Sequence, residues 1–88
     1  MIINENIQQY LNNYHLNKVL DIIIDKVNDY FEYTDLHLEY IDNQLELLII
    51  TNYSSEQALK KLAIFDKCWW IDNQYIANGK ICINIQSK

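Results

Sequence analysis

Two stretches of strand-like sequence, joined by a two-residue turn signal, constrain the fold of this chain more than any other feature. The stretch Leu36-His37-Leu38-Glu39-Tyr40-Ile41 alternates, Asp42-Asn43 follows, and a second strand-like stretch runs from Gln44 to Thr51. Alternation with a period of two predicts half-buried strands, and the short polar turn predicts a hairpin. Closing the hairpin there gives the pairs Tyr40–Leu45, Leu38–Leu47 and Leu36–Ile49. Because every pair on this face is apolar, the register is well specified.

Helical spacing dominates the sequence before the hairpin. From Asn4 to about Asn13, apolar residues recur every three or four positions and Asn4 fits an N-cap. A longer amphipathic helix is expected from Leu16 to about Glu32. The two apolar stripes do not line up at about 100° per residue. Either the chain breaks near Asn12-Asn13 into two helices, or one long helix turns the stripe Ile7/Leu11/Tyr14 away from the core, where it would form an interaction surface.

A third helix and a last strand are expected after the hairpin. Ser54 and Gln57 have the spacing of a capping box, and the apolar face Ala58, Leu62, Phe65 and Trp69 follows. A loop or short hairpin is expected over residues 70–74, a turn at Asn78-Gly79, and a strand from Lys80 to Gln86.

This order predicts one α+β domain over residues 1–88, a two-layer sandwich of α(α)ββαβ order. The β–α–β connection should place the last strand parallel to the second, giving a three-stranded mixed sheet with the helices on one face. If Met1-Ile2-Ile3 adds an edge strand, the order becomes ferredoxin-like.

Composition excludes several classes of function. The chain has one Gly and no Pro, so it cannot form a Gly-rich phosphate loop. A net charge of −5 without any Arg argues against a nucleic-acid partner. No apolar run approaches the roughly 20 residues of a membrane span, and no export signal is recognisable, so we expect a cytoplasmic protein without a membrane partner. No motif predicts a cofactor.

The negative charge is concentrated in the first half of the chain. Residues 1–46 hold nine acids and two lysines, a net charge of −7, whereas residues 47–88 have a net charge of +2. One ridge of carboxylates, spaced by four, four and three residues, is formed by Asp21, Asp25, Asp29 and Glu32. The ridge is either a solvated helix face or the binding surface for a basic partner.

His37, Glu39 and Glu46 are expected to share the outer face of the hairpin. They suggest either an acid–base set or a divalent-cation site, or simply an exposed polar sheet face. A zinc site built from Cys68, Cys82, His15 and His37 lacks the short ligand spacing of such sites. No Ser/His/Asp order or nucleophile elbow is present, so we expect no enzymatic activity.

Adjacent tryptophans are the last notable feature. Either Trp69 belongs to the core while Trp70 covers the end of the sheet, with Asp72 or Asn73 accepting an indole hydrogen bond, or Trp70 anchors a partner. The segment Phe65-Asp66-x-x-Trp69-Trp70-Ile71-Asp72-Asn73, followed by Ala77-Asn78-Gly79-Lys80-Ile81, resembles the C-terminal signature of a family of small bacterial proteins without an assigned activity. This resemblance covers about a third of the chain and implies a shared fold, but no function and no site residues.

Together these features predict a small, acidic, non-enzymatic interaction module that binds a basic protein, as an antitoxin, immunity protein or inhibitor does. Asp21, Asp25, Asp29, Glu32 and Trp70 are the candidate partner-binding residues. Two alternatives are a structural domain that forms homodimers and a metal-binding protein or enzyme that uses His37, Glu39 and Glu46.

Overall fold

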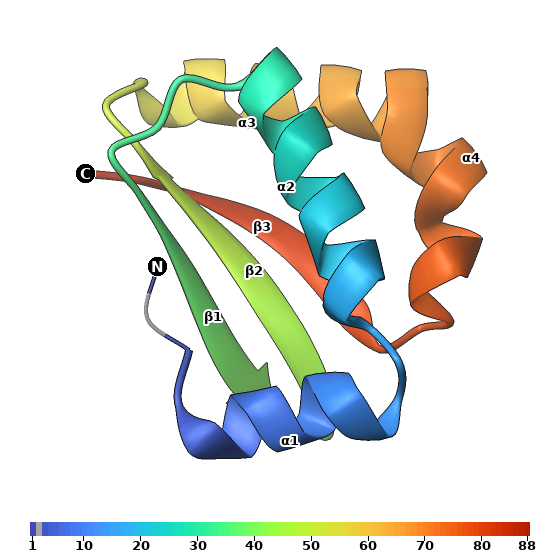
Figure 1. Ribbon diagram of the computed structural model, residues 1–88. Helices are drawn as coiled ribbons and strands as arrows, with labels where there is room; N and C mark the ends of the chain where they lie inside the picture. The colour runs from blue at the N-terminus through green and yellow to red at the C-terminus, as the bar shows by residue number, and fades with distance from the viewer. Residues whose placement is uncertain (2) are drawn as a thin grey trace.

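The protein is a two-layer α+β sandwich, described here from a computed structural model that covers residue 1 and residues 3–88 (Figure 1). The elements, in chain order, are α1 (Glu5–Asn13), α2 (Asn17–Tyr30), β1 (Asp35–Ile41), β2 (Gln44–Thr51), α3 (Ser55–Phe65), the π-helical turn η1 (Asp66–Trp70), α4 (Ile71–Asn73), the 3-10 turn η2 (Gln74–Ala77) and β3 (Ile81–Ser87). The predicted order and fold class are confirmed. The predicted edge strand Met1-Ile2-Ile3 depends on Ile2, which lies outside the described residues.

The sheet has the order β1-β2-β3, with β1 antiparallel and β3 parallel to β2. Asp42 and Asn43 both have positive φ angles, 51° and 63°, which suit the tight turn of a two-residue hairpin. The register pairs Leu38 with Leu47 and Glu39 with Glu46, as predicted. The last strand begins one residue later than predicted, at Ile81.

The helical first half is broken, which confirms the first of the two alternatives. The break lies at His15, whose φ of 56° is left-handed, and the Leu16 N–H donates to the Leu11 carbonyl at 2.8 Å. This 6→1 bond closes a Schellman-type helix end. Ile7 and Leu11 are only 4% and 1% exposed, so the idea that they form an outward-facing stripe is wrong.

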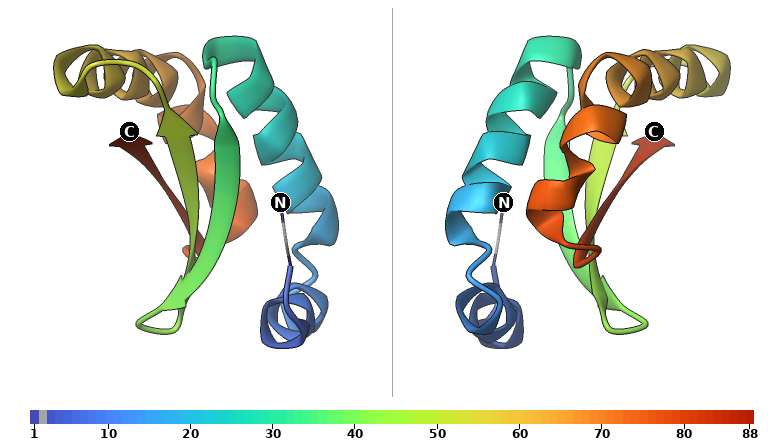
Figure 2. Two further views of the ribbon diagram at one scale, coloured as in Figure 1. Left: turned by 90° about the vertical axis from the view of Figure 1, so that its left-hand side faces the viewer. Right: turned by 90° about the vertical axis from the view of Figure 1, so that its right-hand side faces the viewer.

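The helical layer covers one face of the sheet, and Figure 2 shows that the other face has no helix over it. Leu45, Leu47 and Ile49 of β2 are fully buried beneath α2 and the run that begins with α3. Phe65 joins α3 to the end of α2, because its ring packs against Tyr30 and Phe31 at centroid distances of 5.4 and 5.3 Å. One apolar core therefore holds the elements together.

Residues 70–74 were expected to form a loop or short hairpin, and this prediction is wrong. The helix that begins at Ser55 continues through η1, α4 and η2 to Ala77. The chain then turns at Asn78 and Gly79, with φ angles of 49° and 71°, as predicted. No helix among residues 1 and 3–88 has both the length and the apolar character to span a bilayer.

Candidate functional site

The acidic ridge lies on the solvent side of α2. Asp21, Asp25 and Asp29 are exposed, and α2 ends at Tyr30, two residues before the predicted end at about Glu32. Glu32 is exposed in the connection that follows, where its backbone N–H donates to the Tyr53 hydroxyl oxygen at 2.8 Å. The four predicted carboxylates therefore all face solvent, three on the helix and one just beyond its end.

The ridge carries an energetic cost to the fold. In the described part of the chain the ion pairs are His37–Asp35 and Lys60–Glu56, so none of the four carboxylates is paired with a lysine. Carboxylates four residues apart on a helix repel each other by a few tenths of a kcal/mol per pair. Asp29 also lies in the last turn of α2, which holds no basic residue and where the helix dipole disfavours negative charge.

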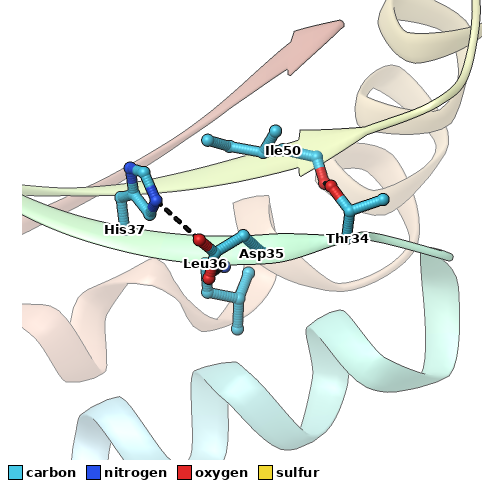
Figure 3. Close-up of polar contacts among 5 residues, drawn as sticks. All are labelled: Thr34, Asp35, Leu36, His37 and Ile50. Carbon is cyan, nitrogen blue, oxygen red and sulfur yellow. Dashed lines mark hydrogen bonds and ion pairs between the residues drawn. The ribbon is translucent and has the colours of Figure 1, made fainter. Parts of the chain in front are cut away.

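His37 is held by a neighbour that the sequence interpretation overlooked. Figure 3 shows its ring directed at Asp35, two residues earlier on the same side of β1. His37 Nε2 lies 2.8 Å from Asp35 Oδ2, and the Leu36 N–H donates to Asp35 Oδ1 at 2.9 Å. The hydrogen bond from His37, followed by that from Leu36, lowers the pKa of the Asp35 carboxyl. The signal available in the sequence was the spacing Asp-x-His within a strand.

The three residues considered as a metal or acid–base set do not act together. Glu39 and Glu46 are register partners, but His37 lies opposite Leu48 and bonds Asp35. Over residues 1 and 3–88, no three His, Cys, Asp or Glu side chains come together as a metal-ligand group. The geometry therefore adds no support to the metal-binding or enzymatic alternative.

Both tryptophans are half-buried and belong to an aromatic row. The rings of Phe65 and Trp69 are 5.7 Å apart and those of Trp69 and Trp70 are 6.0 Å apart. Trp70 also borders a surface hollow beside the start of β3, together with Gln74 and Cys82. Asp72 or Asn73 was expected to accept an indole hydrogen bond, but the Asn73 amide instead donates to the Trp69 carbonyl. Trp70 as a partner anchor stays a prediction.

A group of exposed apolar side chains on the long helical run was missed. They are Leu59, Ile64, Ile71 and Tyr75, all more than half exposed. Ile71 and Tyr75 were not predicted to be exposed helical residues, because a loop or short hairpin was expected over residues 70–74. The extra residue of the π-helical turn shifts the helical phase, so the spacing typical of an α-helix is lost there.

Comparison with known proteins yields no relative. No family model, no curated protein and no solved structure matches the chain. The likeness of residues 65–81 to a bacterial family signature therefore stays a prediction.

Proposed function

We propose that the chain is a cytoplasmic, non-enzymatic interaction module that binds and restrains a basic partner protein, in the manner of an antitoxin, immunity protein or inhibitor. The observation that carries this proposal is the unpaired carboxylate ridge Asp21/Asp25/Asp29/Glu32 on α2. A lysine- or arginine-rich partner would offset the repulsion within the ridge and the unfavourable helix-dipole term. Complementary charge would also speed association and select the partner.

Two further observations support the proposal. Ile22 lies next to Asp21 on α2 and is 46% exposed, so the ridge offers an apolar contact beside its charges. Lys18 and Lys26 lie on α2 itself and Lys61 borders the same hollow as Asp29 and Glu32, but none of these lysines forms an ion pair with the ridge in the described residues. An apolar contact flanked by unpaired charge is the usual make-up of a protein-binding surface.

The test compares three baits in affinity purification from the native host. The baits are the wild-type protein, the ridge variant Asp21→Asn/Asp25→Asn/Asp29→Asn, and a matched control. The control, Glu5→Gln/Glu56→Gln/Asp72→Asn, removes the same charge from exposed positions outside the ridge.

We expect the wild type and the control to retain one basic protein that elutes with rising ionic strength, and the ridge variant to lose it. Retention of the same protein at the same yield by the ridge variant would refute this version of the function. The fold of each bait is checked by circular dichroism.

Self-association is the second candidate, and the uncovered face of the sheet favours it. Ile41 is 45% exposed there and Leu48 and Ile50 of β2 are half-buried. Two such faces would pair across a two-fold axis. Sedimentation velocity over a wide concentration range tests this alternative, and a monomer at the highest concentration contradicts it.

A further inference from the structure

Figure 2 shows the face of the sheet that no helix covers, and the outward strand positions give this face an apolar centre with carboxylates around it. Leu48 and Ile50 point outward from β2, the central strand, and neither belongs to the core cluster. Across the register, Leu48 has His37 on one side and Asn84 on the other, while Ile50 lies between Asp35 and Gln86. The two aliphatic side chains are thus framed by polar groups that remain in water.

Carboxylates are the main charged side chains on this face. The outward positions of the three strands hold the carboxylates of Asp35, Glu39 and Glu46 and no lysine. Glu39 and Glu46 are direct cross-strand partners, an arrangement in which like charges repel. The basic groups beside them are His37, which is bound to Asp35, and the Met1 ammonium, whose charge also lowers the pKa of Asp35. A cation placed over the Glu39/Glu46 pair would therefore gain more there than at an isolated surface carboxylate.

The dimensions of the face match one helix. Three strands about 4.8 Å apart make a platform only slightly wider than a helix with its side chains, which is about 10–12 Å across. At roughly 3.3 Å per residue, β2 spans about 26 Å, the length of a helix of about 17 residues. A single amphipathic helix would cover the apolar centre and set its polar edges against the carboxylates.

We propose that the outer face of the sheet is a docking surface for an amphipathic helix of a partner protein, with aliphatic residues over Leu48 and Ile50 and lysine or arginine beside Glu39 and Glu46. The inference takes from the proposed function only that the partner is basic. It assigns the contact to the sheet, whereas the α2 ridge lies on the helical layer. The arrangement follows the general pattern of an apolar interface centre with a charged rim.

The probe is an 18-residue helical peptide of leucine and lysine with one apolar face, and its counterpart has glutamate in place of lysine. Isothermal titration calorimetry measures binding of each peptide to the full chain. Leu48→Gln and Glu46→Gln test the face. Leu59→Gln and Glu56→Gln on α3 are the matched controls, and Asp25→Asn represents the ridge.

We expect the lysine peptide to bind and the glutamate peptide not to bind. Each sheet-face variant should weaken the affinity about tenfold, since centrally placed contacts each contribute more than 1 kcal/mol. The α3 controls should leave the affinity unchanged, and Asp25→Asn should weaken it less than either sheet-face variant does. Equal loss in the α3 controls, or loss in Asp25→Asn alone, overturns the sheet-face proposal. Loss in Asp25→Asn alone would still leave the ridge-based function standing.

The two cysteines provide a second measurement that needs no variant. Cys82 is on the proposed face, paired in register with Glu46, while Cys68 is exposed on η1. Burial and the Glu46 carboxylate raise the pKa of the Cys82 thiol, so Cys68 should react faster with iodoacetamide in the free protein. Bound lysine peptide should slow alkylation of Cys82 further and leave Cys68 unchanged.

Unchanged alkylation of Cys82 at saturating peptide contradicts the proposal. Protection of Cys82 that rises with protein concentration and without peptide, together with a dimer in sedimentation, would show that a second copy of the chain covers this face. That result would also contradict the proposal that an amphipathic helix of a partner protein covers this face.

Discussion

The side-chain amide of Asn73 donates a hydrogen bond to the backbone carbonyl oxygen of Trp69 at 2.8 Å. The bond lies where the π-helical turn η1 gives way to α4, and where the Ile71 N–H reaches back five residues to the Asp66 carbonyl. Where π-helical i→i−5 hydrogen bonding changes to α-helical i→i−4 bonding, the regular backbone hydrogen bonding of the carbonyls in that turn is disturbed. Asn73 therefore stabilises the turn that carries both tryptophans. This hydrogen bond gives the last residue of the Trp-Trp-Ile-Asp-Asn segment a structural role.

Replacing Asn73 with Ala should destabilise the protein by about 1–2 kcal/mol, because the half-buried Trp69 carbonyl loses its side-chain donor. For a domain of this size that corresponds to a fall in Tm of about 4–16 °C. The control is Gln74→Ala, at the exposed next residue. Thermal unfolding followed by circular dichroism measures both, and equal Tm values for the two variants would contradict the assigned role.

Leu47 and Leu48 are neighbours in β2 that face opposite sides of the sheet, so their truncation should have very different effects. Leu47 is fully buried, and Leu47→Ala should cost about 2–5 kcal/mol. That is a large part of the 5–15 kcal/mol typical of a domain. Leu48→Ala removes a half-buried side chain outside the core and should cost much less. Urea unfolding of both variants tests the register, and equal losses would show that the faces are misassigned.

The sequence predicted the hairpin register because period-two alternation and a two-residue turn leave only one pairing that places Leu36, Leu38, Leu45 and Leu47 on the same face. The helix break was also predictable, since Ile7 and Leu11 can reach the core only if the chain bends before Leu16. The helical run after Phe65 was not predictable from the sequence. Its π-helical turn inserts a residue into the apolar spacing, and the polar pair Asp72-Asn73 resembles a turn.

The site was predictable to a smaller extent. Spacing alone placed Asp21, Asp25 and Asp29 on one exposed helix face, as the structure confirms. Spacing along β1 did not decide which carboxylate His37 would contact, because Asp35 and Glu39 both lie two residues away on the same face. That choice depends on side-chain rotamers, which a sequence pattern does not determine.

The Asp35–His37 contact predicts a pH effect with a definite sign. The bond from His37 lowers the pKa of Asp35 in the folded state. A depressed carboxyl pKa contributes stability above the unfolded pKa of about 3.9, and this contribution is lost as the pH falls through the folded pKa. His37→Phe should therefore raise the Asp35 pKa, as followed by the side-chain carbonyl ¹³C shift of Asp35. Gln86→Ala, which changes an exposed residue on another strand of the same face, is the control and should leave that pKa unchanged.

Removal of the carboxylate of Asp66, the first residue of the π-helical turn, should stabilise the protein at neutral pH. Burial raises the pKa of its carboxyl, so the folded state favours the protonated form. A raised acid pKa contributes stability that is fully present below the unfolded pKa and lost as the pH rises through the folded pKa.

Asp66→Asn keeps a similar shape in a neutral form, so the Tm of the variant should exceed that of the wild type at pH 7. The difference should shrink toward zero below pH of about 3, where the wild-type carboxyl is protonated in both states. Asp72→Asn, an exposed change on α4 with the same chemistry, should show no such pH-dependent gain. A wild-type Tm at or above that of Asp66→Asn at pH 7 would mean that the Asp66 carboxylate has a favourable partner that outweighs its desolvation.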